Sequence, residues 1–241
     1  MTWYAKPRGG YRRNSVEGIG NIFAYRTEFS TWSLESVCGM LANVEAESGF
    51  NPWRWQGDRY GTGRGYGLFQ FTPASGYIGL SGATPNLSVD SVTTGATPED
   101  AVRQIQAFRT NELGKWVSSC WRSYWNTSTY AEMYAYRAQV LARWGSGNSI
   151  SIAEFSEVGD IYDATFIFLA CFEGPKIPNL TARNANAGKI YEILTGDPPP
   201  VPPEPPIPPE PPTPTGDFDV NKFLIYTQRK RNKKVRRFYN E

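Results

Sequence analysis

The chain has 241 residues, of which 40% are hydrophobic and 15% aromatic, which is enough for one domain with a sizeable core. Its formal net charge is only +2, so the chain as a whole carries no signature of nucleic-acid binding. It contains no histidine, which excludes Ser–His and Cys–His catalysis and His-ligated zinc hydrolases, and leaves acid–base chemistry to Asp, Glu, Tyr or Lys.

Neither a secretion signal nor a membrane span is expected. Residues 1–15 are polar and basic without an apolar run, and no segment approaches the ~20 apolar residues that a transmembrane helix needs. The three cysteines have no metal-binding spacing, and Cys38 and Cys171 lie in apolar helical patterns that predict the core. One disulfide among the three remains open, and we expect no metal and no cofactor.

The first predicted helix has apolar residues at Leu34, Val37, Leu41 and Val44, with Ser33 as its N-cap. Residues 51–72 are rich in Gly, Trp and Tyr and have no helical period, so we expect loops with short strands there.

Capping residues and apolar periodicity predict further helices along the chain. The first of them starts near Thr97, with Pro98 at its first position, and the second starts at Tyr130. The third follows a Ser151–Glu154 capping box, the fourth starts at Asp163, and the last has Thr181 as its cap. Gly145 and Gly196 end the second and the last of them. The predicted fold is α+β and mainly α, with a small irregular or β lobe after the first helix.

Composition divides the chain into three regions: a globular domain over residues 1–196, a proline-rich linker over 197–215, and a basic tail over 216–241. The linker is expected to be polyproline II, a stiff spacer of roughly 55–60 Å. The alternative is a ligand for SH3-like or WW-like domains.

The tail combines the basic run 229–237 with apolar residues. These apolar residues are Phe218, Phe223, Leu224, Ile225, Tyr226, Phe238 and Tyr239. The mixture favours docking into a partner protein over a solvated end, DNA contact or attraction to an anionic surface.

A carboxyl group at the end of the first predicted helix has the setting of a glycosidase acid. The helix dipole is negative at its C-terminus and disfavours a carboxylate there. Apolar neighbours act in the same direction, and Met40 and Val44 share a face with Glu47. Periodicity does not choose between Glu45 and Glu47, and for either one a solvated surface position is the alternative.

Two motifs resemble known ones. Residues 47–52, Glu-Ser-Gly-Phe-Asn-Pro, followed by 66–70, Tyr-Gly-Leu-Phe-Gln, resemble the pair of motifs around the catalytic Glu of the lysozyme superfamily. Residues 38–52 and 65–78 are similar to phage tail lysozymes, including the lysozyme domain of the phi29-like tail-knob peptidoglycan hydrolase. Residues 167–175, with Arg183 downstream, resemble a later motif of that family, so the resemblance spans roughly residues 30–195.

This resemblance implies that Glu47 is the general acid and that Glu45 is not. It further implies a virion-associated hydrolase that cleaves the β-1,4 bond between muramic acid and glucosamine units of the peptidoglycan glycan strand during phage entry. Such a protein is made in the host cytoplasm, joins the virion, here through its tail, and acts on the host cell wall. The alternatives are a non-catalytic structural tail protein that kept the fold and an endolysin acting at host lysis.

The sequence departs from related patterns at the second carboxylate. In animal c-type lysozymes this group precedes the second motif, at the position where this chain has Gly65. Asp58 is the nearest candidate to replace it, and a turn residue paired with a neighbouring Arg is the alternative. A lytic transglycosylase would need no second carboxylate. The phi29-like protein also has a zinc-dependent peptidase domain, whose place the linker and tail take here.

Five residues are expected to contact the glycan: Gln70, Tyr66, Trp53, Trp55 and Glu173. For Gln70 the alternative is a structural role joining the lobes, and for the two tryptophans it is core packing. For Glu173 the alternative is a structural ion pair with Arg183.

Overall fold

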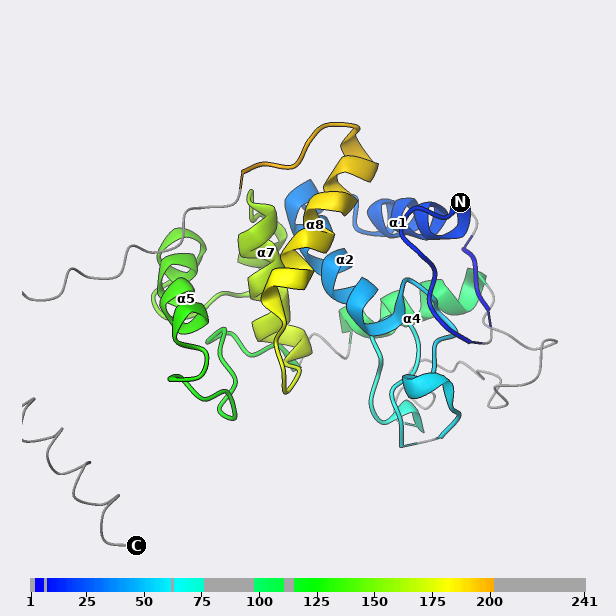
Figure 1. The fold of residues 1–241 in the computed structure, drawn as a ribbon, viewed down its shortest axis with the longest axis horizontal. Coiled ribbons are helices and arrows are strands. Elements are labelled where there is room, and N and C mark those ends of the chain that lie inside the picture. Colours follow the sequence, from blue (N-terminus) through cyan, green and yellow to red (C-terminus); the bar gives the residue numbers. More distant parts are fainter. Residues whose placement is uncertain (1–2, 7, 62, 76–97, 111–114, 202–241) are drawn as a thin grey trace, which may run out of the picture. The chain divides into compact units, whose positions relative to one another are not determined.

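A computed structural model describes residues 3–6, 8–61, 63–75, 98–110 and 115–201. This part of the chain is mainly helical, as predicted (Figure 1). Its helices are α1 (Val16–Glu28), α2 (Leu34–Ser48), α4 (Pro98–Thr110), α5 (Ala131–Trp144), α6 (Ile152–Ser156), α7 (Ile161–Phe168) and α8 (Leu180–Thr195), with a 3-10 turn η1 (Gln56–Asp58) and a π-helical turn η4 (Leu169–Glu173).

The predicted small lobe is irregular rather than β. Among the described residues, β-type pairing is limited to isolated bridges, two of which join Tyr66 to Trp55 and to Phe71. The short strands expected over residues 51–72 are therefore reduced to single bridges, and turns connect them.

Helix α2 forms the centre of the core, and it packs against α7, α8 and α1. Every residue from Ser36 to Val44 is buried. At Gly39 the backbones of α2 and α7 approach each other closely. A Cβ on Gly39 would lie only 2.5 Å from the carbonyl carbon of Ala164 and from the amide nitrogen of Thr165. A larger residue would push α7 away from α2.

Most of the predicted helix boundaries are confirmed. Ser33 accepts a hydrogen bond from the Ser36 amide, and Ser151 and Glu154 form the capping box. Gly145 and Gly196 follow the last residues of α5 and α8. The prediction of Thr181 as a cap is wrong, because α8 begins at Leu180 after Asn179, whose side chain makes no capping bond.

Helix α1 was not predicted, although Ser15 caps it by accepting from the Gly18 amide. Its two glycines weaken the helical pattern. They are needed where the N-terminal segment crosses the helix: a Cβ at Gly18 would lie 2.0 Å from the Arg12 carbonyl oxygen, and one at Gly20 2.5 Å from the Tyr4 ring.

All three cysteines are buried free thiols, so the core positions expected for Cys38 and Cys171 are confirmed. The Sγ atoms of Cys120 and Cys171 lie 2.9 Å apart. None of the helices in the described ranges has both the length and the apolar character that crossing a bilayer requires.

The predicted linker and basic tail lie outside the described residues from position 202 onward, and so does the predicted Thr97 cap. The linker's first residues are described. The Tyr162 hydroxyl donates to the Pro200 carbonyl oxygen at 2.9 Å, so the chain lies against α7 after α8 has ended.

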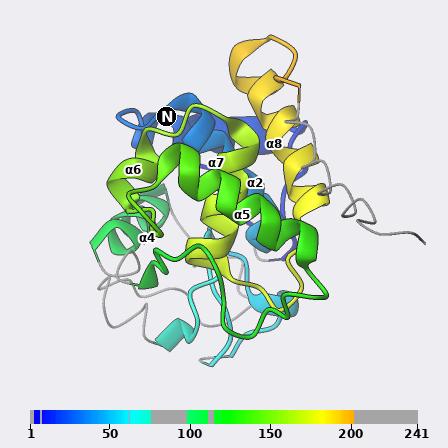
Figure 2. The same cartoon turned by 90° about the vertical axis from the view of Figure 1, so that its left-hand side faces the viewer.

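A buried carboxylate joins α5 to α7, which lie beside each other in Figure 2. The side chain of Asp163 on α7 is 2% exposed and accepts from both Nε and Nη2 of Arg143, at 2.8 and 2.7 Å. The Tyr136 hydroxyl and the Trp144 indole also donate to it. These bonds compensate the desolvation of the carboxylate.

We expect Asp163→Ala to lower the free energy of unfolding by about 3 kcal/mol, because donors on three side chains lose their acceptor. This loss of free energy is at the lower end of the range for a buried ion pair, because the Arg143 side chain is 40% exposed and can be hydrated again. Urea unfolding of the full chain measures the change. Glu192→Ala removes the exposed Lys189–Glu192 pair and should cost less than about 0.5 kcal/mol. Equal losses would show that the Asp163 network contributes no more than a surface pair.

Candidate active site

Glu47 lies in the last turn of α2, which ends at Gly49 in the left-handed conformation (φ 56°). The N-terminal segment passes directly over this end: the Tyr11 amide donates to the Gly49 carbonyl oxygen at 2.7 Å, and a Cβ on Gly49 would lie 2.6 Å from the Gly10 Cα. Glycine is required at position 49 by both the backbone angle and the space. The same contact fixes the helix end that carries Glu47.

The Glu47 carboxylate is paired with a buried cation. Arg183 on α8 is 6% exposed, and its Nη2 donates to Glu47 Oε1 at 2.8 Å. Its other donors bind Asn43 Oδ1 at 3.0 Å and the Pro178 carbonyl oxygen at 3.2 Å. The guanidinium therefore has little freedom to move, and neither has the carboxylate that it holds.

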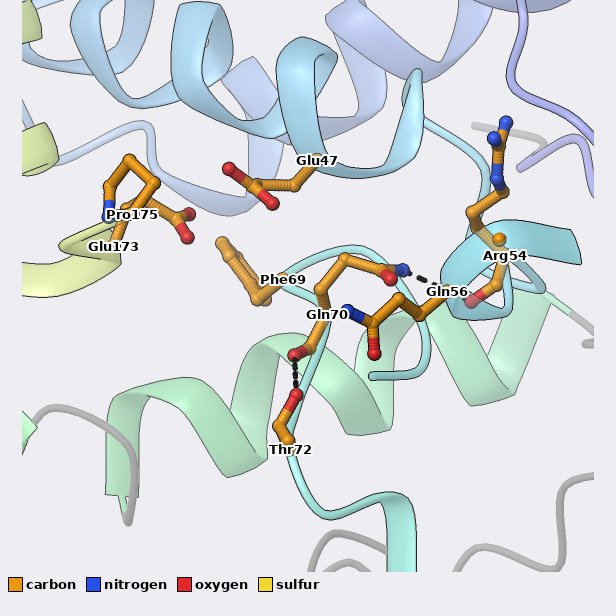
Figure 3. Close-up of a pocket in the computed structure, with 9 residues that line it drawn as sticks. Glu47, Arg54, Gln56, Phe69, Gln70, Thr72, Glu173 and Pro175 are labelled. Carbon is orange, nitrogen blue, oxygen red and sulfur yellow. Dashed lines mark hydrogen bonds between the residues drawn. The ribbon is translucent and has the colours of Figure 1, made fainter. Parts of the chain in front are cut away.

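Glu47 faces a cavity of about 270 Å³. Residues from α2, from the irregular lobe and from the end of η4 surround it (Figure 3). They are Glu47, Arg54, Gln56, Gly57, Phe69, Gln70, Thr72, Glu173 and Pro175. Three residues predicted from the sequence, Glu47, Gln70 and Glu173, therefore line one cavity.

Glu173 is the last residue of the π-helical turn η4, which ends at Gly174 in the left-handed conformation (φ 51°). In Figure 3 the carboxyl groups of Glu47 and Glu173 point toward one another. Oε1 of Glu173 is shielded from solvent and has no hydrogen-bond partner. Burial raises the pKa of Glu173 well above its usual value, and the charge of Glu47 adds to this, whereas Arg183 and Arg122 lower it.

The sequence left open a structural ion pair between Glu173 and Arg183. In the structure the carboxylate bound directly to Arg183 is Glu47, 136 residues away in the chain. Arg183 acts on Glu173 only through the electric field of its charge.

Gln70 lines the cavity and also holds the loop together. Its backbone is in the left-handed region (φ 48°), and its Nε2 donates to the carbonyl oxygens of Arg54 and Gly67 at 3.1 and 3.0 Å. Both amide hydrogens are thus used within the lobe, which is the structural role that the sequence offered as an alternative. Only its Oε1 is left for a hydroxyl of a bound sugar.

Position 65, where c-type lysozymes carry a second carboxylate, has little room for a side chain. A Cβ on Gly65 would lie 3.0 Å from Gln70 Oε1 and 3.1 Å from Thr72 Oγ1. A side chain at this position would require Gln70 and Thr72 to shift by a few tenths of an ångström.

Asp58 does not line the cavity, although its neighbour Gly57 does. Its Oδ1 accepts from Arg54 Nε at 2.9 Å and from the Gly9 amide at 2.8 Å. Its backbone is left-handed (φ 53°), as in a tight turn. These contacts match the alternative interpretation, a turn residue paired with a neighbouring arginine.

Trp53, Trp55 and Tyr66, predicted to stack on sugar rings, are 2%, 0% and 0% exposed. The rings of Trp55 and Tyr66 pack on each other with centroids 4.5 Å apart. In this structure these rings form the core of the lobe, because a region with few regular backbone hydrogen bonds depends on apolar burial. They offer no face to a glycan.

Glu45 and Glu47 have similar partners but different surroundings. Glu45 pairs with Arg13 at 2.8 Å and does not line the cavity. Burial raises the pKa of Glu45, and its hydrogen bond with Arg13 opposes the rise. Of the two carboxyl groups, only Glu47 can meet a ligand in the cavity.

Most of the uncharged residues that line the cavity, and one arginine, were not predicted from the sequence. Arg54, Gln56, Phe69, Thr72 and Pro175 line the cavity, and no periodicity or motif rule marks the role of the first two. Phe69 and Thr72 stand in or beside the second motif, which was the available signal. Within the described part of the chain, no cluster of three or more Cys, Asp or Glu residues has the arrangement of a metal site.

Comparison with known proteins agrees with the geometry. Residues 20–194 match the phage tail lysozyme family. A relative, morphogenesis protein 1 of Bacillus phage B103, is 27% identical over 167 residues, which is 68% of this chain but only 36% of that protein. The matched segment runs from α1 into α8 and so contains Glu47, Gln70, Glu173 and Arg183. The chain belongs to the phage tail lysozyme family.

Proposed function

We propose that this protein is a peptidoglycan hydrolase that cleaves the β-1,4 bond between muramic acid and glucosamine units, with Glu47 as its essential acid. The observation that carries the proposal is the place of Glu47, at the end of a buried helix and facing a cavity with a second carboxyl group and an amide. A glycosidase needs a proton donor beside the scissile oxygen and polar groups that orient the sugar.

In the proposed reaction, protonated Glu47 gives its proton to the glycosidic oxygen while the bond from that oxygen to C1 breaks. The positive charge that develops at C1 is stabilised by a carboxylate in the cavity. Water then attacks C1 and yields a reducing muramic acid. Attack by the sugar's own 6-hydroxyl would instead yield a 1,6-anhydro product.

We further propose that the protein acts from the virion, on the host wall, during entry. Support comes from the family and from the relative, which is named a morphogenesis protein. The predicted basic tail would dock into another virion protein, and the proline-rich linker would separate it from the domain. The tail, and the linker from position 202 onward, lie outside the described residues.

The first test compares two isosteric substitutions, two residues apart. Glu47→Gln keeps an oxygen for Arg183 to donate to but removes the acid, so we expect at least a ~100-fold loss of wall hydrolysis. Glu45→Gln makes the same change in a carboxylate that is also paired with an arginine at 2.8 Å but lies outside the cavity, and activity should stay near that of the wild type. Turbidity loss of purified cell walls measures both. Reversed results would move the acid to Glu45.

The second test concerns Asp58 and the product. Asp58→Asn keeps an acceptor for the Gly9 amide and loses only a partly exposed ion pair, so we expect less than about a fivefold change in activity. Mass spectrometry of the released fragments should find reducing muramic acid ends. A large loss in Asp58→Asn would return Asp58 to the mechanism, and anhydro-muropeptides as the main product would replace hydrolysis by transglycosylation.

The third test separates the domain from the tail. A chain ending at Val201 keeps the contact between Tyr162 and Pro200, whereas one ending at Gly196 would lose it. We expect the chain ending at Val201 to cut isolated walls as the full chain does but to be missing from purified virions. Mass spectrometry of virions reports incorporation. Absence of the full chain from virions would favour an endolysin, and loss of activity in a folded truncation would assign the tail to the enzyme.

A further inference from the structure

The ion pair between Glu47 and Arg183 raises a question about the source of the proton. A general acid must carry a proton when the substrate arrives. Glu47 instead meets a guanidinium that is 6% exposed and bound to Asn43 and Pro178 as well. A cation buried in this way needs an anionic partner, and Glu47 is the carboxylate that it binds directly.

Glu173 has the opposite setting on the other side of the same cavity. Its Oε1 is shielded from water and accepts no hydrogen bond. An ionised carboxylate would be poorly stabilised there, whereas a carboxylic acid can remain without a strong donor. The raised pKa of Glu173, caused first by burial and then by the charge of Glu47, agrees with this geometry.

Three charged groups shift the pKa of Glu173: Glu47 on α2, Arg183 on α8 and Arg122 in the segment before α5. A fourth titratable group, the Tyr25 hydroxyl on α1, is itself influenced by the charge of Glu173. The Tyr25 hydroxyl is buried and unpartnered, and burial together with the charge of Glu173 raises its pKa, so it stays neutral.

Arg122 lies next to the turn that carries Glu173. Its Nη2 donates to the Phe172 carbonyl oxygen at 2.7 Å, while its Nε is shielded and lacks an acceptor. A Cβ on Gly174 would lie 2.4 Å from that Nε. A second cation is therefore in place beside Glu173 for the moments when that residue is ionised.

We propose that Glu47, Arg183 and Glu173 form a triad that holds one transferable proton, with Glu173 as the group that stores it and loads Glu47. In the resting state Glu173 is a carboxylic acid and Glu47 is a carboxylate paired with Arg183. In the loaded state the proton has left Glu173 and is bound to Glu47, and the Glu173 carboxylate is compensated by Arg183 and Arg122. The two states have the same number of protons and the same net charge.

The triad rests on the proposed function and completes it at two points. The loaded state supplies the protonated Glu47 that cleavage of the glycosidic bond requires. It also places an ionised carboxylate across the cavity from Glu47, which is the second group that position 65 does not provide. After the bond breaks, Glu47 is again a carboxylate, and Glu173 takes a proton from the attacking water as that water adds to C1. The triad is then back in its resting state.

The decisive variant is Glu173→Gln, because glutamine has the shape of the neutral acid but no proton to give. We expect at least a ~100-fold loss of wall hydrolysis at neutral pH, with an unchanged melting temperature. Glu173→Asp still titrates and should keep at least about tenfold more activity than the Gln variant. Glu192→Gln makes the same change on the exposed face of α8 and should leave activity unchanged.

The pH profile separates proton storage from a packing role. Because burial raises the pKa of Glu173, the alkaline limb of the wild-type profile should report the ionisation of this group. The limb should move away from its wild-type position in the Gln variant, which has no carboxyl group at position 173. A Gln variant with wild-type activity and profile would overturn the triad, and so would an activity loss at all pH values with a lowered melting temperature.

Infrared spectroscopy of the free protein tests the stored proton without relying on activity. The carbonyl band of a protonated carboxyl group should be present at neutral pH in the wild type and missing in Glu173→Gln. An absent band in the wild type would exclude the triad even if the enzyme cuts glycan. If the wild type shows the band but cleaves no glycan, the proposed function fails while the stored proton stands.

Discussion

The buried guanidinium of Arg183 is the interaction on which the rest of the site depends. It binds Asn43 and Glu47 on α2 and the carbonyl oxygen of Pro178 before α8. Asn43 continues the network, because its Nδ2 donates to the carbonyl oxygen of Thr165 on α7 at 3.2 Å. The same hydrogen-bond network therefore joins α2, α7 and α8 and contributes to the charge balance of the cavity. Removing the cation would affect both the packing of the core and the ionisation of the site.

Two of the groups that face the cavity, Glu173 and Gln70, are carried by backbone that departs from the regular α-helix. Glu173 ends a π-helical turn, an element that recurs at functional sites. Gln70 has a positive φ of 48°, and Phe50, the residue after the Gly49 cap of α2, has one of 59°. Such conformations are costly for residues other than glycine, and the surrounding contacts must maintain them. At Gln70 these contacts are the two carbonyl oxygens that its own amide binds.

The sequence predicted those features that local interactions determine. Ser33 and the Ser151–Glu154 box cap their helices through residues three positions away, and the apolar period of α2 shows in its own segment. Features that depend on distant segments were missed. Helix α1 was hidden by glycines whose purpose appears only when the N-terminal segment packs on it. Burial of Trp55 and Tyr66 could not be told from glycan stacking, because aromatic composition is the same in both cases. The structure supplied the partner of Arg183, which lies 136 residues away.

The cavity has its second carboxyl group on a different element from the one that carries it in c-type lysozymes. A Cβ on Gly65 would lie 3.0 Å from Gln70 Oε1, so a side chain at this position requires Gln70 to shift by a few tenths of an ångström. In this chain the second carboxyl group that lines the cavity is Glu173, at the end of η4. Arg183 is paired directly with Glu47, and burial together with the charge of Glu47 raises the pKa of Glu173, although Arg183 and Arg122 oppose the rise. The proposed triad is consistent with both settings, because one proton shared by two facing carboxyl groups can be given to the glycosidic oxygen and recovered from the attacking water.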